Sequence, residues 1–291
     1  MVSEALLFFL KKGEKEMIAF ENIEITGWMP AIRGMRNPMN AWDKSDSWFP
    51  DLYHETIHNI IGDEMPMPDY LFGEQCDIGE NDLALMKKLA MAGTDHSKFR
   101  RMIIVYMDIT APLYWWKEFD TYKVGTVANS CSTMHKIAEK EFTPDDFSCE
   151  NLMFINEATD GKFEDVVVCD VDYGKNPVPH VRDNMCCTLV GTDTYFQPFS
   201  PMGILLEVIR MLNRARELYI KTKDKKYWWQ MIQLLPSSYN QKRTVMVNYE
   251  VLANIYKSRK NHKLDEWVGF CKLLTTFPYS ELITMEYKEE E

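Results

Sequence analysis

The sequence lacks several features that would assign it quickly to a class. It has no basic tract, and 33 lysines and arginines stand against 44 aspartates and glutamates, for a net charge of −11. General affinity for nucleic acid depends on a basic surface that neutralises phosphates, so we expect no polymeric nucleic acid as a partner. No apolar run approaches the ~20 residues that cross a bilayer, so we expect no membrane partner. The chain also has no internal repeat and no low-complexity tract.

Paired cysteine motifs are absent as well. The seven cysteines contain no Cys-x-x-Cys pair, and their odd number favours reduced thiols and a cytoplasmic protein. The apolar stretch Ala5–Leu10 precedes its charges, Lys11 and Lys12, which is the reverse of the order in a secretory signal. We therefore expect residues 1–20 to form an N-terminal extension, either a short docking helix or a disordered segment.

What is present is typical of a globular protein. Of its 291 residues, 46% are hydrophobic and 13% aromatic, enough for one large domain or two small ones. We expect residues 28–78 to be loops with one short helix near 51–61. Hydrophobic periodicity and turn residues predict strands over 21–27, 102–110 and 166–171, and helices over 82–92 (capped by Asn81), from Pro112 to 121, from Gly203, over 227–235, over 245–258 and from 264 to 278.

Glycines and prolines punctuate residues 150–200 densely, and a short valine-rich strand lies among them. This composition predicts a β-rich, hairpin-like insertion between two more helical parts of the chain. The predicted organisation is therefore an extension over 1–20, one α/β domain made from 21–149 and 201–291, and an insertion over 150–200.

One short motif suggests a metal. His54, Glu55 and His58 have the His-Glu-x-x-His spacing that places two zinc ligands and a general base on one helix face. The longer spacing that supplies a third histidine is absent, because Ile61 and Glu64 occupy the positions of its glycine and histidine. A zinc-dependent hydrolase is thus one hypothesis, and two surface histidines in an acidic loop region are the alternative that we favour.

A second signal is spread along the chain and depends on order and spacing. It joins a helix and a histidine-containing turn to a strand, an Ala-Pro pair, an aromatic helix, a polar segment and, far downstream, a Leu-Pro pair before a final helix. The residues concerned are Gly93, His96–Phe99, Ala111-Pro112, Thr121-Tyr122-Lys123, Asn129–Thr133, Leu235-Pro236, Asn248, Leu252, Asn254 and Arg259.

This order resembles the flavin-dependent thymidylate synthases over roughly residues 81–135 and 203–283. The resemblance implies an α+β fold with a central antiparallel sheet packed with long helices, plus the β-rich insertion that the usual family lacks. It also implies one-carbon transfer to a pyrimidine deoxynucleotide, dUMP, with FAD as cofactor and methylenetetrahydrofolate and NADPH as co-substrates. Sites shared between subunits of a homotetramer belong to the same implication.

The chain departs from the family at the substrate motif. Thr121-Tyr122-Lys123 replaces Arg-His-Arg, so only the last cation is kept, and Cys131 and Thr133 replace a serine over the base and a phosphate-binding arginine. A phosphate dianion favours several charge-assisted donors. Lys117, Lys123, Arg100 and Arg101 could supply some of them from other directions.

Residue by residue, the resemblance implies a site in three parts. Lys123, Arg259 and Cys131 are the candidate catalytic residues, and His96, Lys123 and Asn254 the candidate cofactor-binding residues. The candidate substrate-binding residues are Glu118, Asn129, Ser130, Cys131, Ser132, Thr133 and Arg259. For Cys131, a thiolate nucleophile and a small buried side chain in a serine-sized space are the two alternatives, and we favour the second. Arg259 is either the phosphate ligand or a cation that complements the end of its helix.

Two other functions stay open at this stage. A catalytically degenerate relative would keep the fold and the oligomer while binding another nucleotide or a protein, because a fold does not fix a function. The zinc-dependent hydrolase is the third hypothesis. Bound flavin would support the thymidylate synthase-like enzyme, and a metal-free oligomer without flavin would support the degenerate relative. Stoichiometric zinc would support the hydrolase.

Overall fold

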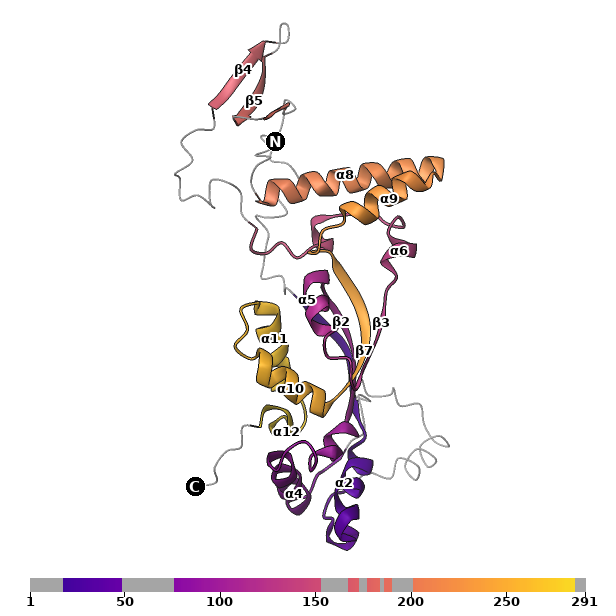
Figure 1. The fold of residues 1–291 in the computed structure, drawn as a ribbon, viewed down its shortest axis with the longest axis vertical. Coiled ribbons are helices and arrows are strands. Elements are labelled where there is room, and N and C mark those ends of the chain that lie inside the picture. The colour runs from indigo at the N-terminus through magenta and orange to yellow at the C-terminus, as the bar shows by residue number, and fades with distance from the viewer. Residues whose placement is uncertain are drawn as a thin grey trace, which may run out of the picture. The chain divides into compact units, whose positions relative to one another are not determined.

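The computed structural model describes residues 18–48, 76–152, 167–172, 177–183, 186–189 and 201–285. Contacts divide these residues into two units (Figure 1). The first, called here the sheet unit, contains residues 18–131 and the chain from 241 onward. The second, called the helical unit, contains residues 132–240. None of the helices in the described part of the chain has the length and hydrophobicity of a membrane span.

A four-stranded sheet organises the sheet unit. Its strands are β1 (Ala19–Thr26), β2 (Ile104–Pro112), β7 (Asn240–Asn248) and β3 (Thr126–Ser130), in the order β1-β2-β7-β3. β1 runs antiparallel to β2, with Ile25 opposite Val105, and β3 runs antiparallel to β7, with Asn129 opposite Thr244. The sheet therefore joins the N-terminal part of the chain to segments that are far away in the sequence.

One face of the sheet carries the core. Along β2, Val105, Met107 and Ile109 are buried while the intervening Tyr106 is exposed, which is the alternation of a strand with one covered face. The helices α5 (Leu113–Phe119), α10 (Tyr249–Arg259) and α11 (Asp265–Leu274) contribute side chains to the same core. Trp115, Trp116, Trp267 and Phe270 contact one another there in an aromatic cluster with edge-to-face and tilted ring pairs. The predicted α+β class with a central antiparallel sheet is confirmed.

Helices close the end of the sheet unit where β1 ends. They are α2 (Trp28–Arg36), α4 (Glu80–Met91), α12 (Glu281–Thr284) and the 3-10 turns η1 (Asn37–Met39), η2 (Trp42–Lys44) and η3 (Lys98–Arg101). The prediction of loops from residue 28 onward is wrong for α2. Trp28, Ala31, Ile32 and Met35 recur at helical spacing and are buried, and a proline is tolerated in a first turn.

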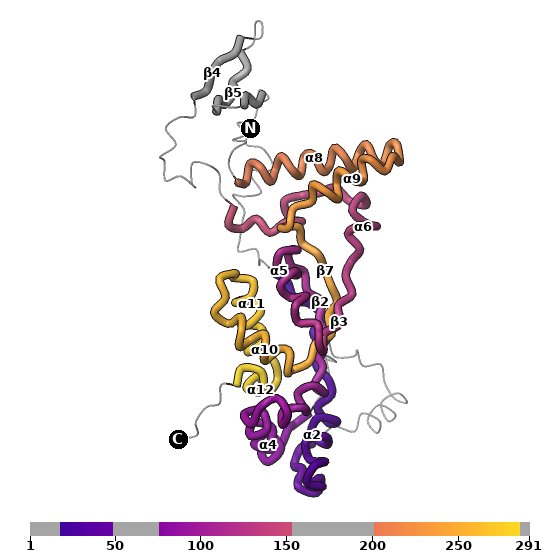
Figure 2. Tube along the Cα trace, in the orientation of Figure 1, coloured from indigo at the N-terminus to yellow at the C-terminus, as the bar shows by residue number. Residues whose placement is uncertain are grey.

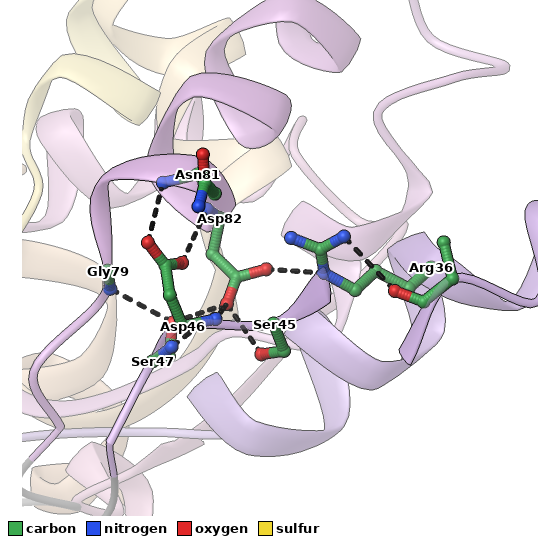
Figure 3. A network of polar contacts seen from close by, with 8 residues as sticks. Arg36, Ser45, Asp46, Ser47, Gly79, Asn81 and Asp82 are labelled. Carbon is green, nitrogen blue, oxygen red and sulfur yellow. Dashed lines mark hydrogen bonds and ion pairs between the residues drawn. The ribbon is translucent and has the colours of Figure 1, made fainter. Parts of the chain in front are cut away.

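A buried acid fixes the segment after α2 onto α4 (Figure 3). Asp82 accepts hydrogen bonds from the Arg36 Nε and from the Ser45 and Ser47 hydroxyls, each at 2.6 Å, and from two backbone N–H groups. Asp46 accepts the backbone N–H groups of Asn81 and Asp82 at 2.9 and 3.1 Å. The predicted cap at Asn81 is wrong, because Gly79 is the N-cap residue and Asp46 supplies the capping carboxylate from a distant segment.

The helical unit is built on two antiparallel helices, whose trace can be followed in Figure 2. α8 (Pro201–Thr222) packs along α9 (Lys225–Leu234), and α6 (Thr133–Lys136) and the 3-10 turn η4 (Pro144–Asp146) belong to the same unit. Leu205, Ile209 and Leu212 of α8 share a core with Phe147 and Met231. The helix predicted from Gly203 is confirmed and begins two residues earlier.

The predicted β-rich insertion contains a three-stranded antiparallel sheet. Its strands are β4 (Val167–Asp172), β5 (Pro177–Asp183) and β6 (Cys186–Leu189), in that order. The helix predicted over 245–258 is wrong at its start, because residues 245–248 complete β7 and α10 begins at Tyr249 after the N-cap Asn248. The single helix predicted from 264 to 278 ends at Leu274.

Candidate functional site

Arg259 lies in the last turn of α10 and contacts side chains from three elements. Its Nε donates to the Tyr122 hydroxyl at 3.0 Å, and its Nη1 donates to the Oε2 of Glu118. The same Nη1 lies 2.8 Å from the Nε2 of His262. The cation therefore joins the end of α5, the turn that follows it and the segment between α10 and α11.

The carboxylate of Glu118 receives its contacts through one oxygen. Oε2 accepts from Arg259 and, at 3.2 Å, from the indole Nε1 of Trp267, and the Nε2 of His262 lies 3.6 Å away. The guanidinium of Arg259 also lies 4.8 Å from the centre of the Trp267 ring. Arg259 is 18% exposed and Glu118 is 35% exposed, so this ion pair reaches the surface of the unit.

Local sequence explains why these residues meet. The aromatic run of α5 buries Trp115, Trp116 and Phe119, which leaves Glu118 on the helix side that borders the surface. Trp267 is fully buried near the start of α11 and holds that helix against α5. Arg259 is near the C-terminus of α10, where a cation also complements the helix dipole. Both alternatives weighed for Arg259 are compatible with this position.

Lys123 follows this cluster in the turn that leads to β3. Its side chain is exposed and has no hydrogen bond or ion pair to any residue that the structure describes. The turn is fixed by Gly125, whose φ is +80°, because a Cβ there would lie 2.6 Å from the Nδ2 of Asn248. Lys123 is therefore an exposed cation that no other described residue engages.

The other cations considered for a phosphate are differently placed. Arg100 is buried and donates to the Leu282 carbonyl at 3.1 Å and to the Ser97 hydroxyl. Arg101 pairs with Glu250 through both Nε and Nη2. These two side chains stabilise the packing of η3, while Lys117 is exposed.

The polar segment after the turn forms the end of β3. Asn129 and Ser130 are exposed, and the Cys131 N–H donates to the Lys242 carbonyl at 3.0 Å. Cys131 is exposed, so the favoured interpretation of a small buried cysteine is wrong. Ser132 and Thr133 begin α6 in the helical unit, where the Ser132 hydroxyl caps the helix by accepting from the His135 N–H at 3.2 Å.

The two remaining candidates are surface residues of the sheet unit. His96 is exposed in the turn between α4 and η3, and Asn254 is exposed on α10. Neither side chain has a hydrogen bond to another residue within the described ranges. The structure therefore brings Glu118 directly to Arg259, and it shows no direct contact of His96 or Asn254 with that pair.

Metal ligation receives no support from the described residues, which contain no group of three or more His, Cys, Asp or Glu side chains placed to hold an ion. His54, Glu55 and His58 lie outside the residues that the structure describes.

Burial raises the pKa of the Cys271 thiol to about 11, although Arg259 and Lys260 act in the opposite direction. That thiol is a packing residue rather than a nucleophile.

Three members of the cluster were not among the predicted site residues: Tyr122, His262 and Trp267. The sequence marks Tyr122 only as a replacement in the altered motif. His262 follows Arg259 by three residues, a spacing that brings side chains together near a helix end. Trp267 carries no sequence signal, because its contact with Glu118 depends on how α11 packs against α5.

Comparison with solved structures identifies the fold. The chain resembles the flavin-dependent thymidylate synthase ThyX from Helicobacter pylori complexed with FAD and dUMP, with 14% identity, a TM-score of 0.51, and coverage of 90% of this chain and 98% of that one. A second structure of the H. pylori enzyme with FAD and dUMP gives 14% identity, the same TM-score and coverage of 92% and 97%. The UMP/dUMP methylase PolB from Streptomyces cacaoi matches with 12% identity and a TM-score of 0.44 over 89% of this chain and 88% of that one.

The likeness to the two H. pylori structures shows a ThyX-like fold. No protein-family model matches the sequence, and no curated protein matches it either. The fold named by the sequence resemblance is therefore confirmed by structure, at a sequence identity too low to carry residue roles with it.

Proposed function

We propose that the chain is a flavin-dependent thymidylate synthase-like enzyme that binds a pyrimidine deoxynucleotide beside Arg259 and Glu118. One observation carries this proposal. The sequence resemblance assigned both residues to the substrate site, and they contact each other although they are 141 positions apart. Agreement between an assignment made by motif order and a tertiary contact supports a ligand site at this place.

The remaining residues take their roles from the same proposal. Lys123 supplies the positive charge for the phosphate, and Asn129 and Ser130 supply neutral donors. Cys131 lies near the nucleobase with its exposed thiol. Because a lysine and hydroxyl or amide donors form weaker phosphate sites than several arginines do, we expect weaker nucleotide binding than the intact motif gives.

The proposal assigns FAD to the three residues that the sequence resemblance gave to the cofactor. His96, Lys123 and Asn254 present exposed polar side chains, one of them a cation, that are not engaged by other described residues. These would hold the pyrophosphate and the polar edge of the cofactor. Reduced flavin supplies a hydride when bound, and methylenetetrahydrofolate and NADPH would be the sources of the carbon and of the electrons. A homotetramer with shared sites is part of the proposal.

The test is to purify the protein and measure its flavin absorbance, followed by thermal-shift titration with dUMP in the presence and absence of FAD. We expect a flavin spectrum and a nucleotide-dependent shift that Lys123→Met reduces. No flavin and no shift at millimolar dUMP would contradict the proposal. A shift by dUMP without flavin binding or turnover would favour the catalytically degenerate relative, and light scattering tests the tetramer.

A further inference from the structure

Arg243 is a cation at the end of the sheet face that carries the core. Val245 and Val247 lie on the same face of β7 and are fully buried, whereas the Arg243 side chain is 15% exposed. Arg243 is paired directly with Ser130, an exposed residue of β3. Because directly paired residues of antiparallel strands put their side chains on the same side of a sheet, the guanidinium and the Ser130 hydroxyl are neighbours where this face meets the surface.

Three contacts hold the guanidinium of Arg243 in position. It lies 4.2 Å from the centre of the Trp116 ring, and the buried Trp116 is itself fixed by donating its indole N–H to the Gln241 carbonyl at 2.9 Å. The Nε of Arg243 donates to the Gln241 Oε1 at 2.9 Å, and Nη1 donates to the Asp120 Oδ1 at 2.8 Å. Nη2 has no partner among the residues that the structure describes. A cation that is already held in place loses little conformational freedom when it binds a ligand.

The same contacts connect Arg243 to the candidate site. Gln241 donates its Nε2 to the Cys131 carbonyl at 3.1 Å, so one side chain bridges Arg243 and the polar segment at the end of β3. Asp120 follows Glu118 by two residues at the end of α5. Arg243 is therefore linked by direct contacts to two segments that contain candidate substrate-binding residues, although its own sequence context carries no signal for such a role.

The carboxylate of Asp120 is a replaceable partner for this cation. Asp120 is 51% exposed, and ion pairs that reach the solvent contribute little to stability. A phosphate dianion offers the same kind of acceptor oxygen with more charge, and the planar guanidinium can donate to two of its oxygens at once through Nη1 and Nη2. Asp120 thus holds a position that a phosphate oxygen can take.

We propose that Arg243 binds the phosphate of the nucleotide through Nη1 and Nη2, displacing Asp120, with the Ser130 hydroxyl as a neighbouring donor. This inference rests on the proposed function and adds a second cation to Lys123. The chain has threonine at positions 121 and 133, where the resemblance leads us to expect arginine. Arg243 compensates for that loss from β7, outside the altered motif.

A ligand without the phosphate tests this directly. Isothermal titration would compare dUMP with deoxyuridine on the full-length protein with FAD added. We expect the wild type to prefer dUMP by about tenfold or more. Arg243→Met, which keeps an apolar side chain over Trp116, should weaken dUMP binding by about ten- to a hundredfold and change deoxyuridine binding by less than about twofold. Equal wild-type affinities for the two ligands would overturn the inference and leave the proposed function standing, whereas no binding of either ligand would contradict both.

Asp120→Asn distinguishes a ligand-binding role from a structural one. If the carboxylate competes with the phosphate, removing its charge should tighten dUMP binding by about two- to tenfold and leave deoxyuridine binding unchanged. If the ion pair only stabilises the end of α5, dUMP binding will be unchanged or weaker, and that result would overturn the inference even where Arg243→Met fails to fold.

The matched control is Arg33→Met, which removes the same charge from an exposed position on α2. It should keep the wild-type preference for dUMP over deoxyuridine. An Arg243→Met protein with the melting temperature of the control and an unchanged preference for dUMP would refute the role of Arg243.

Discussion

Asp82 is the most informative single residue for testing how the sheet unit is stabilised. It is fully buried, and its main partner Arg36 is 5% exposed. Replacing Asp82 with alanine leaves the Arg36 cation buried without its counter-charge and releases the two serine hydroxyls and two N–H groups of residues 45–47. Breaking a buried ion pair from one side costs about 3–5 kcal/mol of folding free energy.

The assay is urea unfolding followed by tryptophan fluorescence, because four tryptophans of the sheet unit are fully buried. With an m-value of about 2 kcal/mol/M, a loss of 3–5 kcal/mol lowers the midpoint by about 1.5–2.5 M urea. The control is Glu139→Ala, which removes an exposed ion pair with Lys136 and should change the stability by less than about 0.5 kcal/mol. A midpoint for Asp82→Ala within the range of the control would refute the reasoning.

The same residue predicts a pH dependence. Burial acts to raise the pKa of Asp82, but hydrogen bonds from Ser45 and Ser47 and the Arg36 guanidinium outweigh it, so the pKa is lowered in the folded state. A lowered folded pKa means that the stabilisation is present above the unfolded value of about 3.9 and is lost as the pH falls through the folded pKa. Asp82→Asn should therefore flatten the acid limb of the stability profile relative to the wild type.

Three further substitutions test other parts of the fold. Gly27→Ala should lower stability in urea unfolding by more than Gly93→Ala does. Both glycines have a positive φ, which costs an alanine about 1–2 kcal/mol, but only at Gly27 would a Cβ lie 2.0 Å from the Met102 carbonyl oxygen. Equal effects of the two substitutions would contradict the steric argument. Asn248→Ala removes the cap whose Oδ1 accepts from the Val251 N–H at 3.0 Å, and should lower stability by about 1–2 kcal/mol and raise amide exchange in the first turn of α10. Leu212→Ala creates a cavity in the helical unit and should cost about 2–5 kcal/mol, seen as faster amide exchange in α8 and α9 while β2 stays protected.

The sequence predicted the long periodic elements well and the short ones poorly. α8 repeats its apolar residues over many turns, so its existence needed no tertiary information. Residues 245–248 of β7 were predicted as the start of a helix, because Val245 and Val247 continue the apolar pattern of α10 toward its N-terminus. What makes them a strand is the pairing with β3, a contact between distant segments that periodicity does not contain.

The candidate site, like the fold, was predictable from the sequence only where the signal is local or lies in the order of motifs. Motif order assigned Glu118 and Arg259 to one site, and these two residues are in contact. The pairing of their charges was not predictable, because it depends on the packing of Trp267 and His262 around them. Likewise, the exposure of Cys131 follows from its place at the end of an edge strand, where its neighbour on β7 covers only the backbone.

The two points at which the chain passes between its units lie on paired strands. Cys131, the last residue before the helical unit, donates its N–H to the Lys242 carbonyl and accepts at its own carbonyl from the Gln241 side chain at 3.1 Å, just after that unit ends at Asn240. Topologically, residues 132–240 are a domain inserted at the tip of a β-hairpin. A two-residue turn could replace all of them without rethreading the sheet. A longer, shorter or different domain could therefore take the place of the helical unit during evolution without changing the order of the strands in the sheet unit.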